Sequence, residues 1–198
     1  ATKGFANGEL ILIAARPSVG KSALGIALLN DLSKNFKTLF VSYEMTSEEI
    51  GMRMVQAKSG VSSNTLYSKK SFTDEVYQKV YEANQKLAQQ HIKIIDEPPR
   101  SFLELRQILR KEKKRGLDVI IIDYLGLIKA FAPNDKWDPY VTTSQISGEL
   151  KMLAKELNVP IIALQQVNRA VTGTNREEAS QKELQLTDLR DSGSLEQD

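Results

Sequence analysis

The chain has 198 residues, of which 41% are hydrophobic and 26% charged, and its formal net charge is only +2. This composition fits one ordinary globular domain with a sizeable core, and the near balance of charge neither requires nor excludes a nucleic-acid partner. The lack of cysteine excludes disulfides, thiolate metal sites and a cysteine nucleophile, and with no signal-peptide pattern and no membrane-length apolar run a cytoplasmic protein is expected.

Continuous apolar runs alternate with amphipathic segments along the chain, and the first strand is predicted at residues 9–14. Four more strands are predicted from TLFVSY, HIKII, LDVIII and VPIIAL, at residues 38–43, 91–95, 117–122 and 159–164. Strands without polar alternation, separated by helices, are typical of a parallel sheet that is covered on both faces. We therefore predict an α/β fold, with a mainly parallel sheet and helices on both faces.

Helices are predicted between these strands. The first begins at Ser22, and its spacing places four leucines on one buried face, Leu24, Leu28, Leu29 and Leu32. The next follows the capping-box pair Thr46 and Glu49 and ends near Gly60. Another begins at Thr73, and its inner face is predicted to consist of Val76, Val80, Ala83 and Leu87.

Two further helices are predicted in the second half of the chain. A second capping box, Ser101 and Glu104, precedes the helix FLELRQILRKEKKR, and residues 110–115 are interpreted as its solvated basic end. A last helix ends at Asn158 and carries Ile146, Leu150, Leu153 and Leu157 on one face.

Residues 129–143 and 168–186 are predicted as long loops. Loops longer than roughly 12–15 residues are uncommon in compact domains and are usually functional or disordered. The sequence assigns neither loop a specific role. His91, at the start of a strand, and Asp96, in the turn DEPP, are interpreted as structural.

Four of the predicted strands end in groups that can take part in chemistry. They are the loop of residues 15–22, Glu44, Asp123 and Gln166. In an open parallel sheet the carboxyl ends of the strands share one edge, and ligands bind outside that edge. Together the four groups predict a ligand site there.

The loop ARPSVGKS, residues 15–22, matches the pattern G-x-x-x-x-G-K-[ST] with Ala15 in place of the first glycine. In such a loop, backbone N–H groups surround phosphate oxygens, Lys21 reaches the β- and γ-phosphates, and the Ser22 hydroxyl coordinates Mg²⁺. Gly20 allows the tight bend, whereas Ala15 requires a conformation open to a residue with a Cβ atom. The alternative is an ordinary strand-to-helix turn with a solvated lysine, but the preceding strand, the following helix and the GKS triplet favour phosphate binding.

The residues at the other strand ends each have a functional and a structural interpretation. Asp123 suits a Mg²⁺ ion that keeps several waters, or it caps its strand. Glu44 orients or deprotonates a water that attacks the γ-phosphate, or it is a turn carboxylate ahead of Thr46. Gln166 senses the γ-phosphate and passes the change to the following loop, or it is a polar strand end, and Gln165 competes for the same role.

Five segments of the chain, in this order, resemble the C-terminal motor domain of the DnaB-type replicative helicases. They are AARPSVGKS, FVSYEM, VIIIDYLGLI, ELKMLAKELNVPIIALQQVNR and LTDLRDSGSLEQD, and they fall between about Gly8 and Asp198. The alanine at position 15 and the closing pattern DLR-SG--EQD are traits of that family rather than of phosphate-binding loops in general. The resemblance implies a single RecA-like P-loop NTPase domain over residues 1–198, a homo-hexameric ring, ATP and Mg²⁺ as cofactors, and movement along single-stranded DNA.

The resemblance also implies a role for individual residues. Lys21, Glu44 and Gln166 are the implied catalytic residues, as phosphate ligand, catalytic glutamate and γ-phosphate sensor. LQQVNR matches the family pattern L-S-Q-L-N-R, which selects Gln166 and leaves Gln165 in the place of the usual serine. The implied Mg²⁺ ligands are Ser22 and Asp123. The implied nucleotide-binding residues are Arg16, Pro17, Ser18, Val19, Gly20, Lys21, Ser22, Ala23 and Arg53.

The family's DNA-contacting segment corresponds to Arg190, Asp191 and Gly193, with Asp191 where glutamate is more usual. In the family, a basic finger from the neighbouring subunit completes each ATP site, and its position is expected beyond Asp198. We therefore expect a fragment that lacks the family's N-terminal domain, linker helix and final segment. Such a fragment should bind nucleotide better than it hydrolyses it, and a helicase loader and primase are the expected partners of the longer protein.

The leading hypothesis is an ATP-dependent replicative DNA helicase motor that hydrolyses ATP at subunit interfaces, moves on single-stranded DNA and unwinds duplex. The alternative is an ATP-dependent switch or loader without unwinding activity. Glu44 favours the helicase, because a switch does not need a well-placed base. A small-molecule kinase ranks last, because the sequence has no recognisable arginine-rich lid.

Overall fold

The computed structural model describes residues 4–16, 18–68, 71–99, 101–123 and 139–166, with side chains in the last range described from residue 145 onwards. Within these ranges one sheet has the strand order β1-β5-β4-β2-β3, and every pair in it is parallel. The strands are β1 (Leu10–Ala15), β2 (Thr38–Ser42), β3 (Ile92–Ile95), β4 (Val119–Asp123) and β5 (Ile161–Gln166). The predicted parallel sheet is confirmed, and its strand limits differ from the predicted ones by one or two residues.

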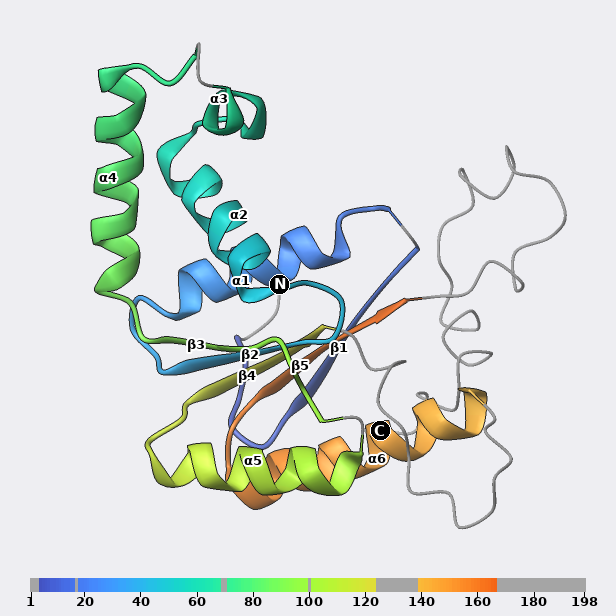
Figure 1. The fold of residues 1–198 in the computed structure, drawn as a ribbon. Helices are drawn as coiled ribbons and strands as arrows, with labels where there is room; N and C mark the ends of the chain where they lie inside the picture. The colour runs from blue at the N-terminus through green and yellow to red at the C-terminus, as the bar shows by residue number, and fades with distance from the viewer. Residues whose placement is uncertain (1–3, 17, 69–70, 100, 124–138, 167–198) are drawn as a thin grey trace, which may run out of the picture.

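Helices cover both faces of the sheet, as predicted. They are α1 (Lys21–Leu32), α2 (Ser47–Ser59), α3 (Ser63–Tyr67), α4 (Asp74–Ala88), α5 (Phe102–Lys114) and α6 (Pro139–Leu157). In Figure 1, α1, α2 and α4 lie on one side of the sheet and α5 and α6 on the other. The chain runs across the sheet in one direction from β1 to β3 and returns from β3 to β5. Because crossover connections between parallel strands are right-handed, this reversal moves the later helices to the opposite face.

The core consists of two apolar clusters separated by the sheet. Alternate residues of the same strand enter different clusters: Ile120 and Ile122 face α5 and α6, whereas Ile121 faces α1 and α2. All three are fully buried. This explains why the strands read as continuous apolar runs, since both of their faces exclude water.

Several predicted helix ends are confirmed. Thr46 and Glu49 form a complete capping box at the start of α2, and Gly60 ends that helix with a left-handed φ of 70°. At the start of α5 the Ser101 hydroxyl accepts a hydrogen bond from the Glu104 amide, which is one half of the predicted capping box. Asn158, after α6, has a φ of 51°.

The buried face predicted for the first helix is wrong in part. Leu24 is 46% exposed, and α1 instead buries Gly25, Ile26 and Leu29 against the sheet. The reason is Gly25: without a side chain there, α1 approaches the Leu164 side chain closely. On α4 the predicted inner face is confirmed, because Ala83 is buried and Val76, Val80 and Leu87 are half-buried.

Two further differences concern helices. The short helix α3 was not predicted, and α6 begins at Pro139, inside the loop predicted at residues 129–143. The first residues of α6 are mostly polar or β-branched, so no apolar period marks them. Residues 129–138 and the loop predicted at residues 168–186 lie outside the described residues. Among the described helices, none combines the length and the apolar character that crossing a membrane requires.

The basic end of α5 is less solvated than predicted. The Glu112 carboxylate is only 10% exposed and pairs with Lys93 of β3 and with Arg115. Burial alone raises the pKa of Glu112, but hydrogen bonds and charge from Lys93 and Arg115 outweigh burial and lower it. The sequence around α5 gave no sign of this pair, because Lys93 comes from another element.

Candidate functional site

The loop between β1 and α1 turns the chain sharply at the carboxyl edge of the sheet. Ala15 is the last residue of β1, so it has extended backbone, as its Cβ atom requires. Ser18 and Gly20 have left-handed φ angles of 65° and 101°, and Gly20 is the N-cap of α1. Glycine suits its angle, whereas Ser18 adopts a conformation that side chains rarely take. The first turn of α1 thereby presents its backbone N–H groups beside Lys21.

A hollow of about 370 Å³ lies at this loop. Its lining includes seven of the residues proposed from the sequence for nucleotide binding: Arg16, Ser18, Gly20, Lys21, Ser22, Ala23 and Arg53. Glu44 and Gln166 also line it. Val19 is 71% exposed beside it, and Pro17 lies outside the described residues. One surface thus brings together groups from the loop after β1, from α1, α2 and β5, and from the turn after β2.

The Lys21 ammonium group faces two carboxylates. Its Nζ lies 2.9 Å from Oδ1 of Asp123 and 3.7 Å from Oε2 of Glu44. The Lys21 and Asp123 side chains are only 8% and 2% exposed, whereas Glu44 is 37% exposed. The protein therefore balances the buried lysine charge itself, chiefly through Asp123. The sequence placed the three residues at one edge but did not predict that they pair.

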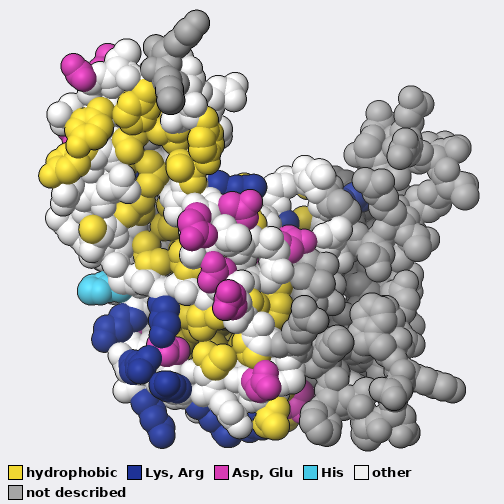
Figure 2. Space-filling model, in the orientation of Figure 1, with side chains coloured by type: hydrophobic (Ala, Val, Ile, Leu, Met, Phe, Trp, Pro, Cys, Tyr) yellow, Lys and Arg dark blue, Asp and Glu magenta, His cyan; other side chains and the backbone are white. Residues whose placement is uncertain are grey.

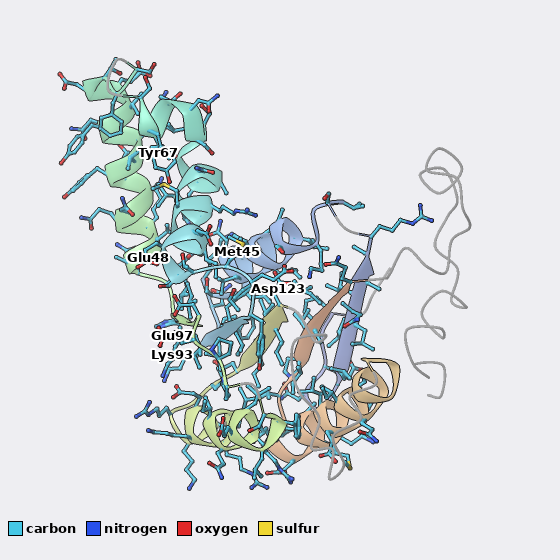
Figure 3. The ribbon with its side chains drawn as sticks, turned by 45° about the vertical axis from the view of Figure 1, so that its right-hand side comes forward. Met45, Glu48, Tyr67, Lys93, Glu97 and Asp123 are labelled. Atoms are coloured by element: carbon cyan, nitrogen blue, oxygen red, sulfur yellow. The ribbon has the colours of Figure 1, made fainter. Side chains whose placement is uncertain are left out.

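The turn that presents Glu44 is held by hydrogen bonds on both sides. The Ser42 hydroxyl donates to the Met45 carbonyl at 2.7 Å and accepts from the Met45 amide at 3.0 Å. The Tyr43 amide donates to the Asp123 carbonyl at 2.7 Å, which ties this turn to the end of β4. Figure 3 labels Met45 and Asp123, which mark these two ends. Ser42 is therefore a positioning residue that the sequence analysis missed, and a serine a few residues before a helix-capping threonine was the available signal.

The structure separates the two glutamines at the end of β5. Gln166 lines the hollow. Gln165 is buried, and alternation along β5 turns it to the face that is covered by α5 and α6. Its Nε2 donates to the Gln166 carbonyl at 3.2 Å. Of the two alternatives, Gln166 is the one whose side chain reaches the site.

The oxygen groups in this hollow fit a nucleotide-bound Mg²⁺ ion. The Ser22 hydroxyl lines the hollow, and the Asp123 carboxylate is at its Lys21 wall. Across the part of the chain that the structure describes, no cluster of three His, Cys, Asp or Glu side chains could hold a metal by itself. Mg²⁺ commonly takes one or two protein ligands and completes its shell with waters and substrate phosphates, so one hydroxyl and one carboxylate suffice for it. The residues proposed for DNA contact, Arg190, Asp191 and Gly193, lie outside the described residues.

Comparison with protein families gives one match over the whole chain. The family is described as the DnaB-like helicase C terminal domain, and its model matches residues 1–198. The replicative DNA helicase DnaB of Geobacillus stearothermophilus is 36% identical over 200 residues, which cover 100% of this chain and 42% of that protein. The replicative DNA helicase DnaB of Mycoplasma pneumoniae is 39% identical over 206 residues, with the same two coverages.

Solved structures show the same relationship. A structure of a DnaB-like replicative helicase and its interactions with primase matches with a TM-score of 0.83 and 29% identity, over 98% of this chain and 46% of that one. A second structure, described as an ATPase domain, matches with a TM-score of 0.81 and 28% identity, over 95% of this chain and 66% of that one. The RecA-like fold predicted from the sequence is thus confirmed. The chain spans about two fifths of the length of the curated relatives named above.

Proposed function

The chain belongs to the family of DnaB-like helicase C-terminal domains, and from this we propose that it is the ATP-hydrolysing motor domain of a replicative DNA helicase. The relatives that carry this activity in their names match the chain from end to end. One observation in the structure supports the proposal most directly. Lys21, which lines the hollow together with Glu44, also pairs with Asp123, so that groups from three parts of the sheet edge meet at one ammonium.

Phosphate binding is assigned to the start of α1. Backbone N–H groups there, from Ser18 to Ala23, are suited to surround phosphate oxygens, and the helix dipole favours their negative charge. Lys21 would leave Asp123 for the β- and γ-phosphates, and the movement is short because Lys21 already lines the hollow. Ser22 and Asp123 would hold Mg²⁺, which supplies positive charge to the phosphates.

Hydrolysis is assigned to Glu44. Its carboxylate lines the hollow and is more exposed than that of Asp123, so it can hold or deprotonate a water that attacks the γ-phosphate. Gln166, on the other side of the hollow, is placed to sense the γ-phosphate, and Arg53 on α2 to approach the nucleotide. Gln166 ends β5 directly before residue 167, so it can transmit the change to the segment that follows.

Work on DNA is assigned to that following segment. Arg190, Asp191 and Gly193 are proposed to contact the backbone of single-stranded DNA inside a homo-hexameric ring, and a basic residue of a neighbouring subunit to complete each ATP site. Six subunits sharing the strand explain why one subunit needs no strongly basic channel surface. A loader and primase are the proposed partners, the latter because one structural relative is described with primase. We place the protein in the cytoplasm.

Three variants of the complete protein test this function. Lys21→Ala should lower the rate of DNA-stimulated ATP hydrolysis by about 100-fold or more, because it removes a charge from the transferred phosphate. Glu44→Gln should lower hydrolysis about as strongly but keep ATP binding, because the amide cannot act as a base. Lys86→Ala, on the exposed surface of α4, is the control and should leave hydrolysis unchanged.

Hydrolysis and unwinding that survive both Lys21→Ala and Glu44→Gln would refute the assignment of the site. Hydrolysis that depends on Lys21 and Glu44 but is not stimulated by single-stranded DNA would instead indicate a switch or loader. The two results separate a wrong site from a wrong activity.

A further inference from the structure

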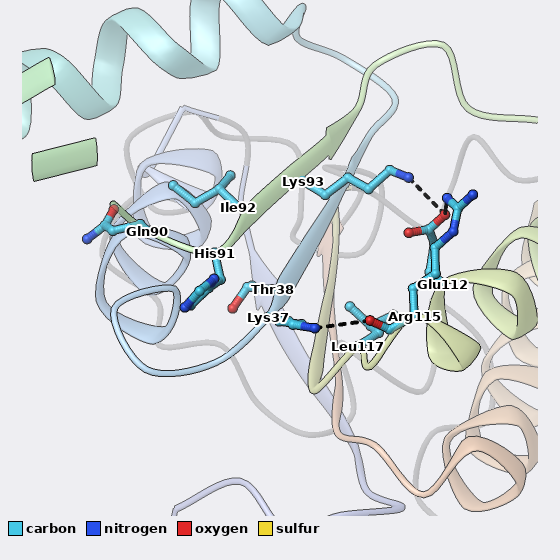
Figure 4. Close-up of a pocket in the computed structure, with 9 residues that line it drawn as sticks. All are labelled: Lys37, Thr38, Gln90, His91, Ile92, Lys93, Glu112, Arg115 and Leu117. Carbon is cyan, nitrogen blue, oxygen red and sulfur yellow. Dashed lines mark hydrogen bonds and ion pairs between the residues drawn. The ribbon is translucent and has the colours of Figure 1, made fainter. Parts of the chain in front are cut away.

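A second hollow, of about 340 Å³, lies at the opposite edge of the sheet from the nucleotide site. It opens beside Thr38 and Ile92, the first residues of β2 and β3, and four charged side chains line it: Lys37, Lys93, Glu112 and Arg115 (Figure 4). Since β2 has five residues, the two hollows are separated by about 15 Å of sheet. The second hollow therefore has no part in phosphate binding at Lys21.

The cations around this hollow are held in place. One oxygen of Glu112, Oε1, accepts from Lys93 Nζ at 2.8 Å and from Arg115 Nη1 at 2.9 Å. Lys37 Nζ donates to the Arg115 carbonyl at 3.1 Å. These contacts order three cations around one carboxylate, which balances only one of their charges. The hollow keeps a surplus of positive charge with its donors already oriented.

Positive charge extends from the hollow along the end of α5. Its last turn contributes Lys111, Lys113 and Lys114, and Figure 2 shows Lys and Arg side chains gathered over this end of the molecule. Within the described residues, neither Lys111 nor Lys114 pairs with a carboxylate, so both ammonium groups are available to bind a ligand.

This charge is a local property of the edge. Two carboxylates belong to this edge, Glu112 and Asp118. Six cations belong to it: Lys37, Lys93, Lys111, Lys113, Lys114 and Arg115. The formal charge of the edge is therefore +4. The whole chain has a formal charge of +2, so all its other residues together sum to −2. A polyanion is thus attracted to this edge rather than to the chain in general.

An exposed aromatic side chain accompanies the cations. Phe36 directly precedes Lys37, is 47% exposed, and lines a neighbouring cavity together with Lys113 and Asp118. Proteins that bind single strands without sequence preference combine cations for the phosphates with aromatic faces for the bases. An acidic polypeptide would use the cations but offers no flat base for Phe36.

We propose that this basic edge, formed by Phe36, Lys37, Lys93, Lys111, Lys114 and Arg115, binds the phosphodiester backbone of a single-stranded nucleic acid without sequence preference. It is proposed in addition to the DNA contacts assigned above to Arg190, Asp191 and Gly193, and shares no residue with them. The proposal does not depend on ATP hydrolysis, because none of its residues belongs to the nucleotide site.

The test uses cross-linking from position 36, which reports this edge alone even if the protein also binds DNA elsewhere. Phe36 is replaced by the photo-crosslinking residue p-benzoylphenylalanine in the complete protein, and cross-linking to labelled oligothymidylate is followed against its concentration. The test variant adds Lys111→Glu and Lys114→Glu, and the matched control adds Lys86→Glu and Lys155→Glu. Both pairs reverse two exposed lysines and change the formal charge equally, so only the position of the change differs.

The expected result is loss of cross-linking in the test variant alone. A single-strand phosphate contact changes affinity by about fivefold at 0.1 M salt, so the half-maximal oligothymidylate concentration should rise by about 25-fold or more. The control should stay within about threefold of the parent. The milder pair Lys111→Gln and Lys114→Gln should also raise the half-maximal oligothymidylate concentration. This second variant keeps the test valid if the charge-reversed protein folds poorly.

Three outcomes would overturn the proposal. Unchanged cross-linking in the test variant would show that α5 does not contact the strand. Equal losses in test and control variants would show only a general charge effect. Competition by polyglutamate or inorganic phosphate as strong as by unlabelled oligothymidylate, at equal negative charge, would assign the edge to acidic polypeptides or free anions instead.

Discussion

Gly25 of α1 and Gly51 of α2 offer a matched pair of substitutions, because each is the fifth residue of its helix. A Cβ atom at Gly25 would lie 2.7 Å from Cδ1 of Leu164 and 3.5 Å from Cε2 of Phe40. At Gly51 it would meet nothing within 4 Å. Leu164 is fully buried, so its methyl group has no open space to turn into. We predict that Gly25→Ala destabilises the protein and that Gly51→Ala stabilises it.

The size of each effect follows from two terms. Alanine is favoured over glycine in a helix interior by about 1 kcal/mol, and this gain applies to both positions. Forcing an extra methyl group into a packed core costs about 1–3 kcal/mol, and this cost applies to Gly25 alone. The free energy of unfolding should therefore rise by about 1 kcal/mol for Gly51→Ala and fall by about 1 kcal/mol for Gly25→Ala. The difference between the variants, about 2 kcal/mol, isolates the packing term.

Urea unfolding followed by circular dichroism measures both values, and thermal unfolding gives a second measure. For a chain of this length 1 kcal/mol corresponds to about 2–4 °C, so the two melting temperatures should differ by about 4–8 °C. Equal stabilisation of both variants would refute the reasoning, since it would mean that Leu164 yields without cost. α1 would then not be held against the sheet by this contact.

Two further predictions concern charges. Asp123→Asn, without added nucleotide, should lower the free energy of unfolding by about 3 kcal/mol because it removes the nearest carboxylate from the buried Lys21 charge. Adding Lys21→Met should recover part of that loss, whereas additive losses in urea unfolding would contradict the pairing. Hydrogen bonds from Arg110 and Arg106 lower the pKa of Glu156 to about 2, so its stabilising effect should be full above about pH 5 and disappear as the pH falls to 2. Glu156→Gln should therefore lower the melting temperature near neutral pH and match the parent near pH 2, and a constant difference across that range would argue against the assignment.

The fold was largely predictable because its strands are buried on both faces. A run such as Ile120–Ile122 has no polar residue to mark one side, and only a parallel sheet covered by helices gives such a run two apolar environments. What the sequence could not give was the rotation of α1. Leucine spacing predicted that the face with Leu24 packs on the sheet. The face with Gly25 packs there instead, because the missing side chain lets α1 approach the sheet more closely.

The candidate site was predictable in its location and not in its contacts. Parallel strands bring their carboxyl ends to one edge, so Lys21, Glu44 and Asp123 had to lie along the same edge once the strands were recognised. Their pairing depends on β2 lying beside β4, and on the Ser42 turn that fixes Glu44 there. Such cross-strand detail has no periodic signal in the sequence. The same applies to Glu112, whose partner Lys93 belongs to an earlier strand.

The two edges of the sheet present positive charge in opposite ways, and the difference decides what each can select. Lys21 is buried and already paired with Asp123, so an anion must offer well-placed oxygens, and replace that carboxylate, before it gains from the lysine. At the other edge Lys111, Lys114 and Arg115 are exposed, and they attract a phosphodiester backbone at long range without demanding one geometry. Binding at the first edge should therefore depend on ligand shape and little on salt. Binding at the second edge should depend on salt and hardly on nucleic-acid sequence. Measuring nucleotide affinity and oligothymidylate affinity of one protein against salt concentration therefore distinguishes the two edges.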